Sequence, residues 1–249
     1  MNKIVFMLIL ALNLFAYSNI EVYTFGMKLN YKEYSNSKVI DRDYSGFNDI
    51  FGIGIKYETG FERFYFNSNI EYAAGDSIYD GSTWNGVSIK VKQTGLYFFN
   101  AKAALGYREI SFHIGYREWQ RGSGNYSGDY KEIYYWPYVG VVLRKKVGNS
   151  KIYFFPQVAY NHGINPKLKV ELGNNPILDL GDTYGGYIEM PLYFKIERFK
   201  FDIFYRFEYW HIHKSKPALL VTSNGVSSIY EPESITKNQY IGVGVEFSF

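Results

Sequence analysis

The chain has 249 residues, no cysteine and a formal net charge of +3, so neither disulfide bonds nor thiolate metal ligands can hold its fold. A charge this small also gives no reason to expect a nucleic-acid partner. Tyrosine, phenylalanine and tryptophan make up 20% of the residues, yet the mean hydropathy is only −0.23. So many large rings in a chain of modest hydropathy are typical of a barrel with a lipid-facing surface.

The first element is an apolar segment at the N-terminus. A basic start precedes an almost wholly apolar run over residues 4–15, and small residues then occupy the two positions that a signal peptidase reads. A membrane-spanning helix needs about 20 apolar residues, and this run is shorter. We therefore predict a signal peptide over residues 1–18, cleaved after Ser18, and a single mature domain over residues 19–249.

Ten later segments alternate strictly between large apolar residues and small or polar ones, which is the period of a β-strand with two different faces. None of the apolar rows contains a charged residue. In chain order they are Tyr23–Tyr31, Phe51–Tyr57, Phe64–Tyr72, Tyr97–Tyr107, Ile110–Tyr116, Tyr135–Leu143, Ile152–Tyr160, Ile188–Ile196, Phe199–Tyr209 and Ile241–Phe249. The pattern predicts an all-β fold, a closed antiparallel transmembrane β-barrel of ten strands, with eight or twelve strands as the alternatives.

The side chains of the apolar rows are too large to fit inside the barrel, so we assign these rows to the outer, lipid-facing surface. A barrel of about eight to ten strands has a narrow interior, which is too small for this many large side chains. The interleaved rows are rich in glycine and in small or polar residues, which suit such a lumen. A Lys or Arg facing the middle of the bilayer would cost about 2–4 kcal/mol, which explains the absence of charge from the apolar rows.

The connections between the strands alternate in length. Those after the second, fourth and eighth strands have two residues (Thr59-Gly60, Arg108-Glu109 and Glu197-Arg198), and the one after the sixth covers residues 145–150. The remaining connections are long and polar. Short periplasmic turns and long external loops are typical of outer-membrane barrels, in which both termini then lie on the periplasmic side.

The last strand carries the most specific signal. Over residues 241–249 every odd position is large and apolar, every even position is Gly, Glu or Ser, and the sequence stops on Phe249. This strand resembles the closing strand of bacterial outer-membrane β-barrel proteins. The resemblance implies that Phe247 and Phe249 form a signal read by the barrel-assembly machinery. It also implies export through the periplasm, insertion among outer-membrane lipids and, we expect, a monomer.

Charged residues in the predicted inward rows nearly balance, with six basic and five acidic side chains. Such groups should pair across a narrow interior, because an unpaired buried charge is costly. These lumen-lining charges are Lys28, Lys56, Glu71, Lys102, Glu189, Lys195, Lys200, Asp202, Arg206, Glu208 and Glu246. They favour either a structural barrel filled by ion pairs or a narrow polar channel for small solutes with little ion selectivity.

Bulky side chains in the same inward rows bear on that choice. They are Trp136, Tyr138, Tyr153, Phe155, Tyr193 and Phe204. Their volume favours a blocked or very narrow lumen over a general porin.

An enzyme is the rival interpretation, although a non-enzymatic role is favoured and no cofactor is predicted. In strand number the barrel is similar to the omptins, outer-membrane proteases with an acidic pair and an Asp-His pair near the outer rim. The candidates for such pairs are Asp76, Asp80, His162, Asp179 and Asp182. Their spacing departs from that family, because the second-loop acids are four residues apart and no Asp lies two residues before His162. A lipid hydrolase would need a Ser-His-acid set, for which Ser111 and His113 are an inward pair on one strand.

Two further hypotheses concern the extracellular end. His211 and His213 are two residues apart on a predicted strand, so both face the same way and could hold a metal ion, although no third ligand is evident. The long loops over residues 161–184 and 212–237 contain tyrosines and the apolar run Leu219-Leu220-Val221. Loops of this kind are often binding surfaces, so an adhesin with loop-mediated contacts is the third class of function.

Overall fold

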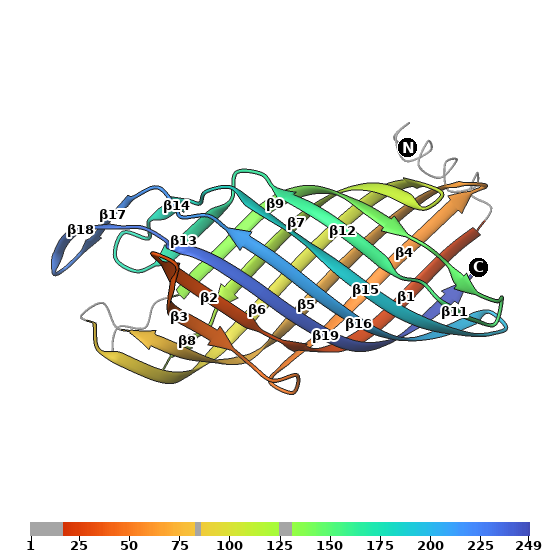
Figure 1. Cartoon of the computed structure of the whole chain (residues 1–249), viewed down its shortest axis with the longest axis horizontal. Coiled ribbons are helices and arrows are strands. Elements are labelled where there is room, and N and C mark those ends of the chain that lie inside the picture. Colours follow the sequence, from red (N-terminus) through yellow and green to blue (C-terminus); the bar gives the residue numbers. More distant parts are fainter. Residues whose placement is uncertain (1–16, 83–85, 125–130) are drawn as a thin grey trace, which may run out of the picture.

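The computed structural model describes residues 17–82, 86–124 and 131–249 (Figure 1). The predicted signal peptide lies outside these ranges except for Tyr17 and Ser18, so that prediction is not tested. Within the described residues, no helix is long and apolar enough to cross a membrane.

The described residues form antiparallel strands joined by turns and loops. In chain order the strands are β1 (Tyr17–Lys28), β2 (Asn30–Ser35), β3 (Lys38–Tyr44), β4 (Ile50–Phe61), β5 (Phe64–Ser82), β6 (Ser88–Tyr107), β7 (Ile110–Arg121), β8 (Ser123–Gly124), β9 (Lys131–Arg144), β10 (Val147–Gly148), β11 (Ile152–Phe154), β12 (Gln157–Gly163), β13 (Lys167–Glu171), β14 (Ile177–Asp179), β15 (Thr183–Ile196), β16 (Phe199–Ile212), β17 (Ala218–Thr222), β18 (Gly225–Ile229) and β19 (Glu233–Ser248).

Ten of these strands close into a ring, which confirms the predicted barrel and its strand number. In order around the ring they are β1, β4, β5, β6, β7, β9, β12, β15, β16 and β19. The ring closes where β1 pairs with β19, from Asn19 opposite Ser248 to Lys28 opposite Gln239. The shorter strands mostly continue the wall, while β17 and β18 form a separate hairpin that projects from one end (Figure 1).

The two ends of the barrel differ as predicted. Both described termini lie at one end (Figure 1), where two residues join β4 to β5, β6 to β7 and β15 to β16. The first residue of each turn has a left-handed backbone, with φ of 53° at Glu62, 54° at Arg108 and 55° at Glu197, as tight hairpins require. The first turn lies at residues 62–63 instead of Thr59-Gly60, because β4 and β5 pair beyond the predicted limit.

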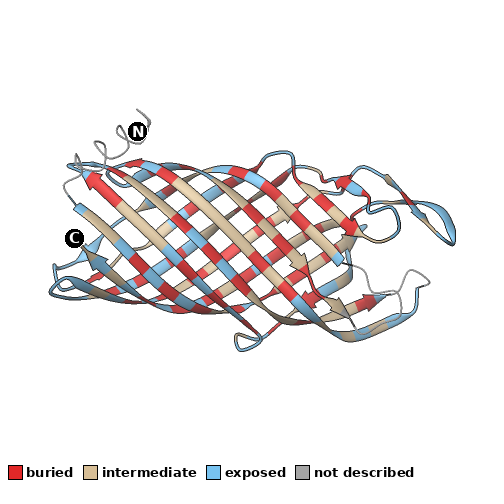
Figure 2. Ribbon diagram, turned by 180° about the vertical axis from the view of Figure 1, so that it is seen from behind, coloured by how far each residue is buried: buried red, intermediate tan, exposed pale blue. Residues whose placement is uncertain are grey.

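At the opposite end the wall extends beyond the membrane. A strand crosses the bilayer with about 9–11 residues, whereas β5 has 19 and β6 has 20. Along much of the membrane-spanning part, more buried residues alternate with more exposed ones, as on β1, β4 and β19 (Figure 2). The outward positions are apolar even though they are exposed, as Ile53 (55%), Phe112 (70%) and Val243 (52%) illustrate. This outer surface is therefore the lipid-facing one.

The first strand departs from the prediction. Tyr23, Phe25 and Met27 point into the barrel and are at most 3% exposed. Lys28 is exposed on the outer face. The lipid-facing assignment of the row Tyr23–Tyr31 and the lumen assignment of Lys28 were therefore wrong.

The reason for the inverted strand lies on its neighbour. Gly54 is directly opposite Tyr23 and Gly52 is opposite Phe25. A Cβ atom added to Gly54 would lie 2.1 Å from the ring of Tyr23, so the glycine leaves the space that the ring occupies. The same cross-strand pairing of glycine with an inward ring recurs for Gly106 and Tyr65, Gly115 and Tyr138, and Gly242 and Phe204. The glycines of the inward rows therefore accommodate aromatic side chains of the adjacent strand.

Candidate functional site

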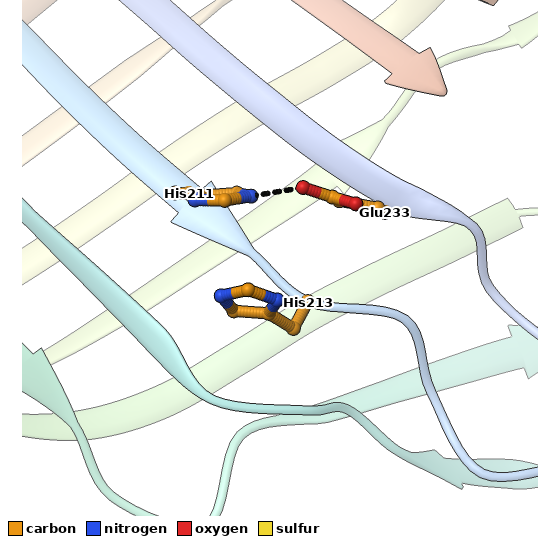
Figure 3. A group of neighbouring side chains, drawn as sticks. All are labelled: His211, His213 and Glu233. Carbon is orange, nitrogen blue, oxygen red and sulfur yellow. Dashed lines mark hydrogen bonds and ion pairs between the residues drawn. The ribbon is translucent and has the colours of Figure 1, made fainter. Parts of the chain in front are cut away.

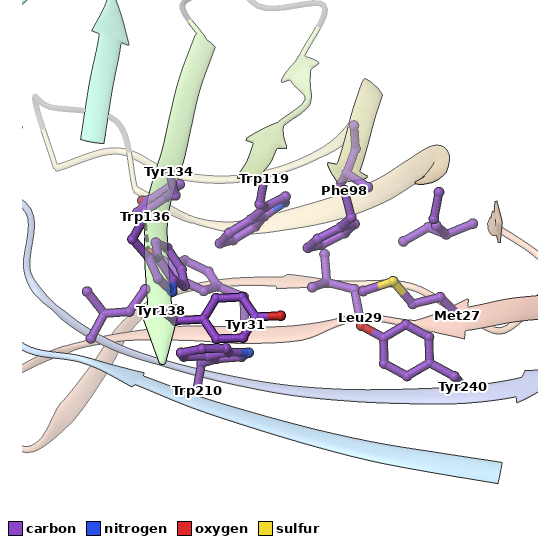
Figure 4. Packing of buried hydrophobic residues seen from close by; sticks show 14 of the residues in the cluster. Met27, Leu29, Tyr31, Phe98, Trp119, Tyr134, Trp136, Tyr138, Trp210 and Tyr240 are labelled. Atoms are coloured by element: carbon purple, nitrogen blue, oxygen red, sulfur yellow. Dashed lines mark hydrogen bonds between the residues drawn. The ribbon is translucent and has the colours of Figure 1, made fainter. Parts of the chain in front are cut away.

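The lumen is filled by aromatic side chains toward the end that carries the long loops (Figure 4). Trp119, Trp136, Trp210, Tyr31 and Tyr134 are each at most 2% exposed. The indole of Trp119 stacks on Tyr134 at 4.9 Å between ring centroids and meets the edge of Tyr31 at the same distance. These five side chains, named here the aromatic layer, are buried inside the barrel.

A charged cluster lies beyond the aromatic layer, toward the extracellular end. The guanidinium of Arg121 lies 2.7 Å from Asp43, 2.8 Å from Glu33 and 2.6 Å from Glu132. A fourth carboxylate, Glu231, accepts hydrogen bonds from the hydroxyl groups of Tyr31 at 2.8 Å and Tyr134 at 2.7 Å. One positive charge therefore faces four carboxyl groups.

This cluster lies above the lipid. On its strands the outward neighbours Lys32 and Arg42 are charged and lie opposite each other, so this part of the wall is outside the hydrocarbon. Burial raises the pKa of Glu33 to about 7, against the opposing effect of Arg121. Burial likewise raises the pKa of Glu231 well above its ordinary value. The excess of buried acids over Arg121 is thus partly relieved by protonation.

The periplasmic half of the lumen is polar and held by ion pairs. Arg206 contacts both oxygens of Glu71, at 2.6 and 3.0 Å, and its Nε lies 2.8 Å from Glu189. Lys56 lies between Glu189 at 3.6 Å and Glu21 at 3.0 Å. These five residues, named here the inner ion network, join strands from opposite sides of the barrel.

A cavity of about 470 Å³ accompanies the inner ion network. Its lining reaches from Tyr17 and Ser248 at the periplasmic mouth to Arg206 and Trp210. Lys102 lines it as well, and its Nζ donates to the hydroxyl of Tyr187 at 2.9 Å. Among the described residues, no carboxylate lies within ion-pair distance of Lys102, which distinguishes it from Lys56.

Most of the predicted lumen charges lie inside the barrel. Lys200 pairs with Glu246, and Glu208 pairs with Arg117 at 2.9 Å. Asp202 is buried, and within the described ranges neither of its oxygens accepts a hydrogen bond. Lys195 is exposed at the periplasmic mouth, where it lines the cavity. The residues that point inward are Lys56, Glu71, Lys102, Glu189, Lys200, Asp202, Arg206, Glu208 and Glu246.

Several inward charges were missed by the sequence reasoning. Arg117 and Arg121 lie on β7 at the parity of His113, beyond the point where the predicted strand stopped. Extending the alternation past Tyr116 would have found both. Glu21 was missed because the first strand was inverted, and Asp43 because its strand was predicted as a loop.

The candidate protease residues do not assemble. Asp80 pairs with Arg42, Asp76 with Lys92 and Asp179 with Lys167, all on the exposed wall. His162 faces outward on β12, and within the described part of the chain it makes no hydrogen bond with any of these acids.

The Ser-His candidate is equally incomplete. Nε2 of His113 is 2.7 Å from the side-chain oxygen of Asn161. Within residues 17–82, 86–124 and 131–249, no acid contacts His113 and no hydrogen bond joins it to Ser111. The geometry therefore supports neither enzyme hypothesis.

His211 and His213, the weak metal candidates, are brought together with a third residue. Nε2 of His211 lies 2.6 Å from Glu233, and the imidazole rings are 4.4 Å apart between centroids. Glu233 could not be predicted as the third ligand, because its strand β19 is separated from β16 by the long β17–β18 connection.

A closed antiparallel ring with an apolar outer band, tight turns at one end and extended walls at the other is the fold of a bacterial outer-membrane β-barrel. The chain thus has the fold of an integral outer-membrane barrel. No protein-family model matches the sequence, and no curated protein matches it.

Comparison with solved structures agrees with this fold. The outer-membrane protease OmpT of Escherichia coli aligns over 94% of this chain and 98% of its own, with a TM-score of 0.53 and 11% identity. The translocator domain of the autotransporter NalP from Neisseria meningitidis aligns over 91% and 88%, with a TM-score of 0.42 and 10% identity. At 11% identity the likeness to OmpT shows the fold alone.

Proposed function

We propose that this chain is a structural outer-membrane barrel whose lumen does not conduct solutes. The observation that carries the proposal is the aromatic layer, in which five large side chains that are at most 2% exposed lie across the barrel. The cavity on the periplasmic side stops at Trp210 and includes neither Trp119 nor Tyr134 in its lining. A solute entering from the periplasm would therefore meet closely packed rings.

The charges on either side of the aromatic layer support the same conclusion. Arg117 is paired with Glu208 and lies against the rings of Trp136 and Trp210, at 6.0 and 5.4 Å from the ring centroids. Opening the lumen would separate this pair and expose the rings at the same time. Because both changes are unfavourable, we expect the closed state to dominate.

Export and assembly belong to the same proposal. The predicted signal peptide over residues 1–18 would direct the chain to the periplasm. Phe247 and Phe249 are exposed on the outer face, with ring centroids 6.0 Å apart, and are available to the barrel-assembly machinery. We propose that the mature barrel is a monomer embedded in outer-membrane lipids.

A second candidate function rests on the periplasmic cavity. Its volume of about 470 Å³ is sufficient for a small solute. Lys102, without an ion-pair partner among the described residues, would favour an anionic group there. This candidate requires binding from the periplasmic side and becomes a narrow channel only if the aromatic layer opens.

Single-channel recording in a planar bilayer separates the two candidates. We expect the refolded mature barrel to be silent, and a Trp119→Ala, Trp136→Ala double variant to show openings. Phe155→Ala is the matched control, because Phe155 lines the cavity already open to the periplasm; it should remain silent. Steady openings of the unaltered barrel that change when Lys56 or Glu71 is replaced would overturn the structural proposal and support the channel.

A further inference from the structure

Three potential metal ligands meet on the outer rim of the barrel. His211, His213 and Glu233 each offer one ligand atom, and these atoms lie within 4.8 Å of one another (Figure 3). The three side chains are half-buried. We propose that they form a binding site for a divalent transition-metal ion such as Zn²⁺.

The strand register explains why the three residues meet. Ile212 on β16 pairs with Ser234 on β19, and both point into the barrel. His211, His213 and Glu233 are their immediate neighbours along the chain, so they alternate to the outer face and lie side by side. The arrangement is thus built into two paired strands of the barrel wall.

The site lies outside the hydrocarbon. Lys237 is exposed and charged on β19, opposite Tyr209, which is nearer the periplasm than the three candidate ligands. Since the lipid-facing band carries no such charge at its centre, the rim above Tyr209 and Lys237 is in contact with water. Metal ions can therefore reach the site from the extracellular side.

Hydrogen bonding prepares the first imidazole for coordination. Nδ1 of His211 lies 2.6 Å from the hydroxyl oxygen of Tyr184, and its Nε2 lies 2.6 Å from Glu233. A ligating histidine usually makes such a contact through its other nitrogen, which fixes the ring and its tautomer. In the structure Nε2–H donates to the Glu233 carboxylate. Once a cation replaces this proton, Nδ1–H donates to the hydroxyl oxygen of Tyr184, and Nε2 faces the cation next to Glu233. A cation at this point would be bound by both atoms.

The second imidazole is available as a ligand. Within the described residues, the ring nitrogens of His213 accept and donate no hydrogen bond, although the ring lies 5.9 Å from that of Tyr184. Ligand atoms around a tetrahedral Zn²⁺, at about 2.0–2.1 Å from the metal, are about 3.4 Å apart. Side-chain rotation of His213 closes the present gap. Two imidazoles and one carboxylate favour Zn²⁺, Ni²⁺ or Cu²⁺ over Mg²⁺ or Ca²⁺.

The position of the ligands suggests what the metal would do. His213 and Glu233 are at the two ends of the connection over residues 214–232, which contains the β17–β18 hairpin. The base of this connection is already joined, since Ser215 N donates to the carbonyl of Glu231 at 3.0 Å. A metal ion bound by both ends would lock the base and order the projecting hairpin.

Metal binding can be measured directly on the refolded full-length mature barrel. Equilibrium dialysis against Zn²⁺, followed by metal analysis, should give one equivalent per barrel, and Ca²⁺ at the same concentration should give none. His211→Ala and His213→Ala should each abolish the stoichiometric site. Tyr184→Phe should weaken binding about 10- to 100-fold, as for other residues that orient a ligating histidine. His162→Ala is the matched control, since His162 also faces outward but belongs to no such cluster among the residues that the structure describes.

A second readout tests the effect on the hairpin. Zn²⁺ should slow protease cleavage within residues 214–232 in the unaltered barrel and leave the rate unchanged in His213→Ala. Less than one equivalent of Zn²⁺, binding that survives in the His211→Ala, His213→Ala double variant, or equal loss in His162→Ala would overturn the site. Stoichiometric binding without protection of the hairpin would overturn its role as a clasp. Circular dichroism of each variant identifies any that fails to fold.

Discussion

The two halves of the lumen solve the same packing problem in different ways. Toward the extracellular end, rings such as Trp119 and Tyr134 fill the barrel and leave almost no exposed surface. Toward the periplasm, Arg206 and Lys56 hold carboxylates from opposite walls, and a cavity of about 470 Å³ remains beside them. The wall around both halves is the same ten-stranded ring.

Because the two halves are packed differently, they should be sensitive to different substitutions. Aromatic packing seals by volume, so a lost ring leaves a hole. An ion network instead depends on every member, because a buried charge without its partner is costly. The charged cluster of Arg121 combines both situations, since its acids outnumber the one guanidinium and lie next to the aromatic layer.

The largest expected effect is in the inner ion network. Arg206→Ala leaves Glu71 and Glu189 without their shared guanidinium, and should lower the free energy of unfolding by about 3–5 kcal/mol. Arg42→Ala is the control, because its ion pair with Asp80 is exposed and its loss should change the free energy of unfolding little. Urea unfolding of the refolded barrel in lipid vesicles measures both. Equal losses in the two variants would show that the periplasmic half is not held by its charges.

A pH dependence is expected in the extracellular half. The pKa of Glu33 is about 7 in the folded chain against 4.5 for the ordinary carboxyl. The folded state therefore retains this proton while the unfolded state loses it, and stability falls as the pH rises from about 4.5 to 7. At about 1.4 kcal/mol per pKa unit the loss is about 3 kcal/mol. This contribution to the loss of stability should be absent in Glu33→Gln, because the neutral side chain of glutamine cannot ionise.

The measurement for Glu33 is a difference between two proteins. Urea midpoints of the unaltered barrel and of Glu33→Gln are compared at intervals across this pH window, so that contributions of all other groups cancel. The variant should gain stability relative to the unaltered barrel as the pH rises. A constant difference would mean that Arg121 keeps Glu33 ionised throughout.

The smallest expected change in stability is found by replacing two lysines of the same cavity, one at a time. Among the described residues, Lys56→Met leaves Glu21 with only the hydroxyl of Tyr193 at 3.4 Å, and should lower the free energy of unfolding by about 2 kcal/mol. Lys102→Met removes one hydrogen bond to Tyr187 and should lower the free energy of unfolding by about 1 kcal/mol or less. Thermal unfolding in detergent micelles is sufficient to rank them. The reverse order would point to a bound anion that normally pairs with Lys102.

Much of the fold could be predicted because the lipid imposes a simple rule on each strand: every second residue faces the lipid and must be apolar and uncharged. Rows such as Ile110–Tyr116 and Phe199–Tyr209 alternate with period two and exclude charge, so the strands and their outward faces follow from local sequence. The rule failed for Tyr23–Tyr31, where the lumen itself is apolar. The signal for that exception was nonlocal, since it lies in Gly52 and Gly54 on the next strand.

The candidate site was less accessible to sequence reasoning. Alternation placed Glu71, Glu189 and Arg206 inside the barrel, but it could not say which charges would meet. Pairing across a lumen depends on the register and tilt of strands far apart in the sequence. The meeting of His211 with Glu233 across 22 residues has the same origin.

The transmembrane barrel, ten as the favoured number of strands, and the end that carries the tight turns could all be predicted from the amino-acid sequence. Those properties follow from hydrophobic alternation and turn length, which act within a few neighbouring residues. Three features are visible only in the tertiary structure: the packing of the aromatic layer inside the barrel, the joining of Glu71 to Glu189 by Arg206, and the position of Glu233 beside the two histidines. Each of these depends on closure of the ring, which brings side chains from distant strands into contact.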